Sequence, residues 1–124
     1  MKQIYELHAE VCKTLANPKR IEIINLLSGG EKSVGWLLDK TSWLKANLSQ
    51  HLAVMRNKGI LKSRKEGLAV YYRIASPKVI QACDLMREVL FEQMQEREKT
   101  FLKWQKTSRR KNNKRNGNGK TKYN

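Results

Sequence analysis

Apolar residues recur at helical spacing along the start of the chain. Ile4, Leu7, Val11 and Leu15 lie three or four positions apart, so they fall on one side of a helix. This pattern predicts an amphipathic helix over about residues 3–16.

Two further helices are indicated before residue 41. Asn17-Pro18 marks the start of one, because asparagine can cap a helix and proline fits its first position; Gly29-Gly30 marks its end. Ser33 can cap a third, short helix that runs to about Lys40.

The stretch over residues 41–58 is the most informative part of the chain. A short connection leads into a helix over about 46–58, as is typical of helix-turn-helix units. Leu48, Leu52 and Met55 share one face of this helix and can anchor it in a core. The other faces carry polar and basic side chains, which suit the reading of base edges in a DNA major groove.

A hairpin pattern follows this predicted recognition helix. Residues 61–65 and 69–74 are β candidates on either side of Glu66-Gly67, and Gly67 can supply the positive φ of a tight turn. A recognition helix followed by a basic hairpin is the layout of a winged helix that binds DNA.

The last predicted helix is long. It starts at Ser76-Pro77, carries a broad apolar stripe and extends past Phe101. Such a stripe exposes more apolar surface than a small domain can cover, so we expect a homodimer formed by the first and last helices. The predicted fold is therefore mainly α with a small β-hairpin wing: a dimeric winged helix-turn-helix.

The net charge of the chain favours a polyanionic partner. The formal charge is +15, and residues 103–124 contribute nine Lys or Arg and no acid. We expect residues 1–102 to form one domain for DNA binding and dimerisation, and residues 103–124 to be a basic, disordered tail. The tail is either a generic nucleic-acid anchor or an extension with no selected role.

The composition also excludes several classes of protein. No apolar run approaches the roughly 20 residues of a membrane span, and the N-terminus lacks the apolar core of a secretory signal. We therefore expect no membrane partner and a cytoplasmic chain with reduced thiols. With two Cys, two His and no clustered carboxylates or Gly-rich phosphate loop, we expect neither enzymatic activity nor a cofactor.

Three strings, in order and at matching separations, carry a family resemblance. They are residues 15–24 (Leu-Ala-Asn-Pro-Lys-Arg-Ile-Glu-Ile-Ile), residues 47–52 (Asn-Leu-Ser-Gln-His-Leu), and Glu66-Gly67 with Val70-Tyr71-Tyr72-Arg73. Across roughly residues 5–95 the chain resembles the ArsR/SmtB family of dimeric winged-helix repressors. The resemblance implies a homodimer that represses transcription and releases DNA when a metal or a thiol-reactive signal binds.

The metal sites of that family are not matched. Members with a site in the third helix use a Cys-x-Cys pair, where this chain has Ser33 and Gly35. Members with a zinc site in the last helix use Asp and His, whereas this helix has Asp84 and Glu88 but no His. We expect no metal site. Leu44-Lys45 also replaces the usual small polar pair before the recognition helix, which leaves the start of that helix open.

The candidate DNA-binding residues lie on the recognition helix and the wing. Polar side chains are expected to read bases or position the helix, and cations to neutralise phosphates. The set is Lys45, Ala46, Asn47, Ser49, Gln50, His51, Arg56, Lys62, Arg64, Lys65 and Arg73. The alternatives are a structural role for His51 and a solvated basic edge for the wing.

Cys12 and Cys83 are the candidates for signal sensing. They lie on the first and last predicted helices, where oxidation, persulfidation or a soft metal could strain the dimer interface. The simpler interpretation is that both are small apolar packing residues. Trp36 and Trp43 are interpreted as packing residues, and His8 as an interface histidine.

The sequence therefore predicts a sequence-specific transcriptional regulator that binds double-stranded DNA as a homodimer. We expect a repressor on an inverted-repeat operator, either released by a thiol-reactive or soft-metal signal or constitutive. One alternative is a nonspecific architectural nucleic-acid-binding protein driven by charge. Another is a protein-interaction module that keeps the fold but no longer binds DNA.

Overall fold

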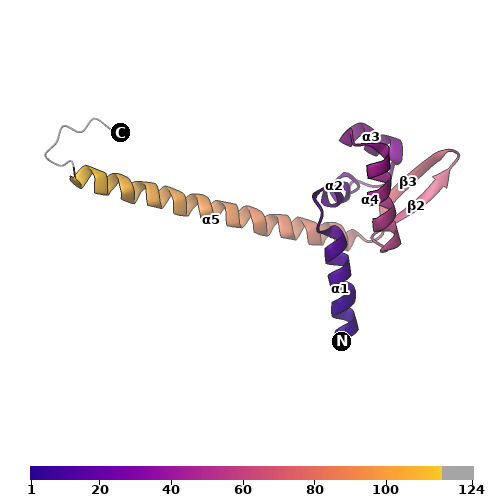
Figure 1. Cartoon of the computed structure of the whole chain (residues 1–124), viewed down its shortest axis with the longest axis horizontal. Coiled ribbons are helices and arrows are strands. Elements are labelled where there is room, and N and C mark those ends of the chain that lie inside the picture. The colour runs from indigo at the N-terminus through magenta and orange to yellow at the C-terminus, as the bar shows by residue number, and fades with distance from the viewer. Residues whose placement is uncertain (116–124) are drawn as a thin grey trace. The chain divides into compact units, whose positions relative to one another are not determined.

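The computed structural model describes the backbone of residues 1–115 and the side chains through Arg110 (Figure 1). The chain divides into two compact units, Met1–Asp84 and the residues from Leu85 onward. In chain order the elements are α1 (Lys2–Leu15), α2 (Pro18–Leu26), β1 (Lys32–Ser33), α3 (Val34–Thr41), α4 (Lys45–Asn57), β2 (Leu61–Glu66), β3 (Ala69–Ile74) and α5 (Pro77–Arg115).

Side-chain caps set the starts of α2 and α3, as predicted. Asn17 Oδ1 accepts hydrogen bonds from the backbone N–H groups of Lys19 (3.0 Å) and Arg20 (3.3 Å). Ser33 Oγ accepts one from the N–H of Trp36 at 3.0 Å. These N–H groups have no partner inside their helices, so each cap stabilises its helix by about 1 kcal/mol.

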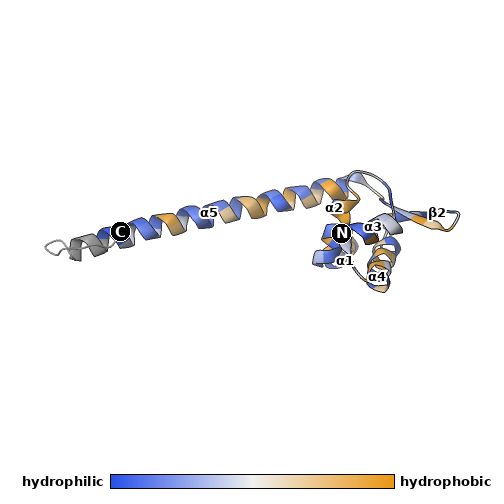
Figure 2. Ribbon diagram, turned by 90° about the horizontal axis from the view of Figure 1, so that it is seen from above, coloured by the Kyte–Doolittle hydropathy of each residue, from blue (hydrophilic) through white to orange (hydrophobic). Residues whose placement is uncertain are grey.

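The core of the first unit gathers apolar side chains from α2, α3, α4 and the strands. Leu48, Leu52 and Met55 of α4 are each 0% exposed, which confirms the predicted inward face of that helix. Figure 2 shows hydrophobic and hydrophilic residues alternating along α4. Burial of each such side chain contributes about 1.5–3 kcal/mol. The other buried apolar residues are Ile23, Ile24, Leu27, Leu37, Ile60, Leu61 and Tyr72.

The wing is part of a three-stranded antiparallel sheet with the order β1-β3-β2. The hairpin of β2 and β3 was predicted, and Gly67 has the positive φ of +59° that its turn requires. The pairing of β1 with β3 was missed, because Lys32 and Ser33 form a strand of only 2 residues, too short to show a period. This strand joins the wing to the start of α3.

The helix α5 differs from expectation at its C-terminal end. The prediction of a disordered tail over residues 103–124 is wrong for residues 103–115, because α5 continues through Arg115. Lys and Arg are good helix formers, and no glycine follows until Gly117. The rest of the predicted tail, residues 116–124, lies outside the described residues.

The second unit carries apolar side chains that are open to solvent. On α5, Leu90, Met94, Phe101 and Trp104 are each at least half exposed, and the rings of Phe101 and Trp104 stack at 6.4 Å. In the first unit, by contrast, Val79 of the same helix packs against the core. No helix among the described residues is long and apolar enough to span a membrane.

Candidate nucleic-acid interface

The N-terminal half of α4 presents one exposed polar surface. Its start is one residue earlier than predicted, at Lys45, and the N-cap residue Leu44 makes no side-chain capping bond. The N–H groups of the first turn are therefore left for a partner such as a phosphate oxygen. The predicted residues on this surface are all exposed: Lys45, Ala46, Asn47, Ser49 and Gln50. Arg56 is exposed near the other end of the helix.

His51 is held from inside the protein. Its Nδ1 accepts a hydrogen bond from Arg20 Nε at 3.1 Å, so the ring proton resides on Nε2. Desolvation, followed by the positive charges of Arg20 and Lys19, lowers the pKa of His51. An imidazole that accepts at Nδ1 is neutral, and this hydrogen bond joins α2 to α4 through His51. A contact between its Nε2–H and DNA stays a prediction.

Arg20 ties three helices together at this point. Besides His51 of α4, it donates from Nη1 to the carbonyl oxygen of Thr14, near the end of α1, at 3.1 Å. Trp43 lies edge-on to His51 at 6.5 Å, and Lys19 Nζ lies 5.2 Å from the centre of the Trp43 ring. Sequence reasoning missed Arg20, although it lies within the string at 15–24 that carried the resemblance. Its functional partner is 31 positions away, and no local pattern indicates such a pair.

The wing cations do not form one patch. Directly paired residues of an antiparallel sheet point to the same face. Lys62 pairs with Arg73, and Arg64 with Tyr71, so these three cations share one face, whereas Lys65 pairs with Val70 on the other. Lys62, Lys65 and Arg73 are exposed.

Arg64 differs from the other wing cations because it is ion-paired within the protein. Glu31 and Glu66 both accept from its guanidinium. The hydrogen bond from Arg64 lowers the pKa of Glu31, and the two carboxylates raise the pKa of Arg64. A phosphate would have to displace these carboxylates, which places the predicted DNA contact of Arg64 in question.

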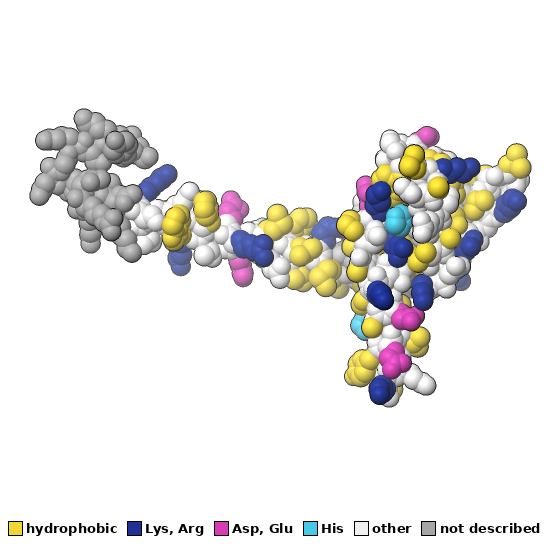
Figure 3. Space-filling view, in the orientation of Figure 1, with side chains coloured by type: hydrophobic (Ala, Val, Ile, Leu, Met, Phe, Trp, Pro, Cys, Tyr) yellow, Lys and Arg dark blue, Asp and Glu magenta, His cyan; other side chains and the backbone are white. Residues whose placement is uncertain are grey.

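A hollow of about 550 Å³ lies between α3, α4 and the wing. Lys45 and Ser49 line it from the recognition helix, and Leu68 and Val70 from the wing. Leu68 at the hairpin tip is fully exposed, so the hollow is open. It separates the two parts of the predicted DNA surface. Figure 3 shows Lys and Arg side chains on the first unit and exposed hydrophobic side chains along the second.

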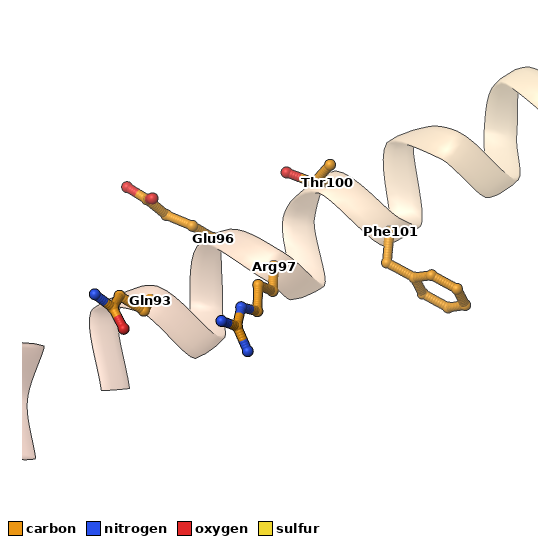
Figure 4. A pocket seen from close by; sticks show the side chains of 5 residues that line it. All are labelled: Gln93, Glu96, Arg97, Thr100 and Phe101. Carbon is orange, nitrogen blue, oxygen red and sulfur yellow. The ribbon is translucent and has the colours of Figure 1, made fainter. Parts of the chain in front are cut away.

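The second unit shows no comparable site among its described residues. A shallow hollow on α5 is lined by Gln93, Glu96, Arg97, Thr100 and Phe101 (Figure 4). All five side chains come from a single helix, so they form an open surface and not an enclosed cavity.

The two cysteines have different surroundings. Cys12 on α1 is exposed, Cys83 on α5 is partly buried against the core, and they are not joined in a disulfide. Trp36 and Trp43 also pack partly against the core, which confirms their predicted packing role. His8 is exposed in the single chain. No group of three His, Cys, Asp or Glu in the described part of the chain could hold a metal ion.

The helix-turn-helix, the three-stranded wing and the exposed face of α4 define a winged helix-turn-helix protein. The family model described as "Bacterial regulatory protein, arsR family" matches residues 17–63. The HTH-type transcriptional regulator Rv0081 of Mycobacterium tuberculosis is 43% identical over 88 residues, covering 70% of this chain and 77% of that protein. The chain therefore belongs to the arsR family of bacterial regulatory proteins.

Solved structures agree with this assignment. The crystal structure of Rv0081 has a TM-score of 0.69 at 40% identity, covering 76% of this chain and 95% of that one. A homodimeric winged helix-turn-helix DNA-binding domain from Mycobacterium bovis has a TM-score of 0.70 at 30% identity, covering 77% of this chain and 88% of that one.

A further sequence relative is also a named regulator. The transcriptional activator HlyU of Vibrio cholerae is 35% identical over 77 residues, covering 62% of this chain and 71% of that protein. The chain is thus a transcriptional regulator, a class of DNA-binding proteins distinct from enzymes.

Proposed function

We propose that this regulator recognises a specific operator through the N-terminal half of α4. The observation that carries the proposal is the division of α4 into two faces. Leu48 and Leu52 fix the helix in the core, while Asn47, Ser49 and Gln50 stand exposed beside them. Short polar side chains on a rigid helix can make the paired hydrogen bonds that distinguish base edges in the major groove.

The cations take a different part in this proposal. Lys45 at the start of α4, Arg56 near its end, and Lys62, Lys65 and Arg73 on the wing neutralise phosphates. Such contacts provide affinity for any DNA, so they fix the position of the protein while α4 selects the sequence.

The regulator acts as a homodimer in this proposal. The apolar side chains of α1 and α5 that are open in the single chain, among them Leu7, Met86 and Leu90, give the dimer its interface. The M. bovis domain, solved as a homodimer, supports this arrangement. A twofold dimer carries two α4 helices related by the same axis, so its operator is an inverted repeat with half-sites separated by whole helical turns. The protein acts in the cytoplasm, beside its DNA.

Selection of bound sequences from a random duplex pool by the purified full chain tests the proposal. We expect enrichment of one inverted repeat, bound at least about 10³-fold more tightly than random DNA at physiological salt. Equal affinity for both would overturn the proposal in favour of an architectural protein driven by charge. No binding by a chain lacking residues 103–124 would favour an interaction module.

The proposed direction of regulation is repression, because a dimer that covers an operator excludes other proteins from the same DNA. HlyU is named an activator, so membership of the family does not decide the direction. Transcription in vitro from a promoter that contains the selected site decides it: we expect fewer transcripts as the protein is added. More transcripts would make this chain an activator on the same DNA.

A further inference from the structure

Arg64 on β2 is the centre of a cluster of ion pairs. Its Nε donates to Glu31 Oε1 and Oε2 at 2.9 and 3.0 Å, and its Nη2 donates to Glu31 Oε1 at 2.7 Å. Its Nη1 donates to Glu66 Oε2 at 2.7 Å. All three guanidinium nitrogens are therefore engaged by carboxylates of the same chain. The two-pronged contact with Glu31 fixes the direction of the guanidinium as well as its distance.

The cluster spans the full width of the sheet. Arg64 pairs with Tyr71 of β3, and Tyr71 pairs with Ser33 of β1, so the three residues form one row across the strands. The guanidinium lies over the Tyr71 ring at 4.5 Å and reaches Glu31, the residue just before β1. Arg64 thus connects the outer strand of the wing to the segment that leads into α3.

The base of the wing is fixed by Leu61 and Tyr72, which are buried in the core, so this connection matters for the part of the hairpin nearer its tip. Only two residue pairs join β1 to β3. A two-stranded hairpin is marginally stable by itself. An exposed ion pair adds little to the free energy of unfolding, but a bidentate pair stacked on a ring restricts where the hairpin points.

We propose that Arg64 is a positioning residue that holds the wing at a fixed angle to α3 and α4, and that it is not a phosphate contact. The inference rests on the proposed DNA-binding function. The phosphate contacts of the wing then come from Lys62, Lys65 and Arg73. The Arg64–Glu31 pair sets where those cations meet the DNA.

Substitution of Glu31 distinguishes phosphate binding by Arg64 from positioning of the wing, because the two roles predict opposite changes in DNA affinity. If Arg64 binds phosphate, Glu31 competes with the DNA, and Glu31→Gln strengthens binding. If the pair positions the wing, Glu31→Gln weakens it; we expect about a tenfold loss of affinity for the selected operator. Glu22→Gln removes the same charge from the exposed side of α2 and is the matched control, for which we expect no loss.

The salt dependence of binding gives a second measure. Each neutralised phosphate contributes about 0.9 to the slope of log K against log salt, so removal of one such cation from both subunits of a dimer lowers the slope by about 2. For Arg64→Ala we expect weaker operator binding with a slope changed by less than half of that. Lys65→Ala is the control, and its slope should fall by the full amount.

Exchange of the two charges completes the test. The double variant Arg64→Glu with Glu31→Arg keeps the net charge and can re-form the pair. We expect it to bind the operator more tightly than either single reversal but less tightly than wild type, because Glu66 loses its donor and faces a like charge. Circular dichroism melts confirm folding of every variant. Tighter binding by Glu31→Gln, or a fall in slope of about 2 for Arg64→Ala, would overturn the inference about Arg64. A wild-type protein without sequence preference would instead overturn the proposed function.

Discussion

Arg20 and His51, 31 positions apart, form a direct hydrogen bond between α2 and α4, with Arg20 Nε donating to His51 Nδ1 at 3.1 Å. The same Arg20 side chain donates to the carbonyl oxygen of Thr14 at 3.1 Å. One side chain thus links the end of α1 and the start of α2 to the middle of the recognition helix. The orientation of α4 depends on this link as well as on its buried apolar face.

Loss of the Arg20 side chain should therefore destabilise the domain. We expect Arg20→Ala to lower the free energy of unfolding by about 1–2 kcal/mol, because His51 and Thr14 both lose their donor. Arg20→Lys keeps the charge but cannot donate from two separate nitrogens, so it should recover only part of the loss. Urea unfolding followed by circular dichroism measures both. Full recovery by lysine would mean that charge, and not the two directed bonds, stabilises the site.

The partly buried position of His51, beside the positive charges of Arg20 and Lys19, also makes stability depend on pH. The pKa of His51 in the folded chain lies below its ordinary value of 6.5, so the unfolded chain binds this proton first as the pH falls. The free energy of unfolding should decrease as the pH falls below about 6.5, until the folded-state pKa is also passed. We expect a smaller decrease in His51→Gln than in wild type. Urea unfolding of both proteins across this pH range measures the difference, and an equal decrease in both would show that other groups set the pH dependence.

Substitution of Gln50 tests whether α4 recognises bases. Its side chain is exposed on α4 and makes no core contact, so Gln50→Ala should leave stability unchanged. We expect a loss of about 1–3 kcal/mol on the selected operator and almost none on random duplex DNA. Fluorescence anisotropy with both DNAs measures this difference, and Asn57→Ala at the far end of α4 is the matched control. Equal losses on both DNAs would reassign Gln50 to positioning of the helix.

The positions that the sequence predicted well are those with a short-range signal. The helical period of Leu48, Leu52 and Met55, and the caps Asn17 and Ser33, depend on neighbours within a few residues. The order of these elements also sufficed to place the exposed face of α4.

The positions that the sequence did not predict depend on long-range pairing. Arg64 looked like one more wing cation, since nothing near it in sequence shows that Glu31, 33 positions earlier, accepts from it. The same holds for Arg20 and His51. The continuation of α5 through the first part of the predicted tail was missed for another reason: repeated Lys and Arg indicate a solvated chain, yet both residues also have high helix propensity.

The basic end of the chain should contribute to nonspecific DNA binding. Removal of residues 103–124 takes away nine positive charges and none of the buried core residues of the first unit. We expect an unchanged melting temperature for the first unit, weaker binding to random DNA, and a salt slope that is shallower by about 0.9 for each phosphate that this segment neutralises. The double variant Lys103→Gln with Lys106→Gln keeps the length of α5 and removes only charge. It therefore distinguishes the effect of the lost charges from the effect of the lost residues. An unchanged slope after the deletion would show that this segment does not bind DNA.

The last prediction concerns the two thiols, the softest redox-active groups of the chain. Cys12 is exposed, whereas Cys83 is partly buried against the core, so a thiol reagent should modify Cys12 first. Added atoms on Cys83 would disturb the packing of the start of α5 on the core, and we expect DNA release only after Cys83 reacts. Binding to the operator is measured before and after a polysulfide, a peroxide and arsenite, with mass spectrometry to confirm modification. Cys12→Ser should keep the response and Cys83→Ser should lose it, while zinc, which lacks a three-ligand site in the described residues, should have no effect. If the wild-type protein still binds the operator tightly and specifically after both cysteines are modified, the cysteines are packing residues and the regulator does not respond to these signals.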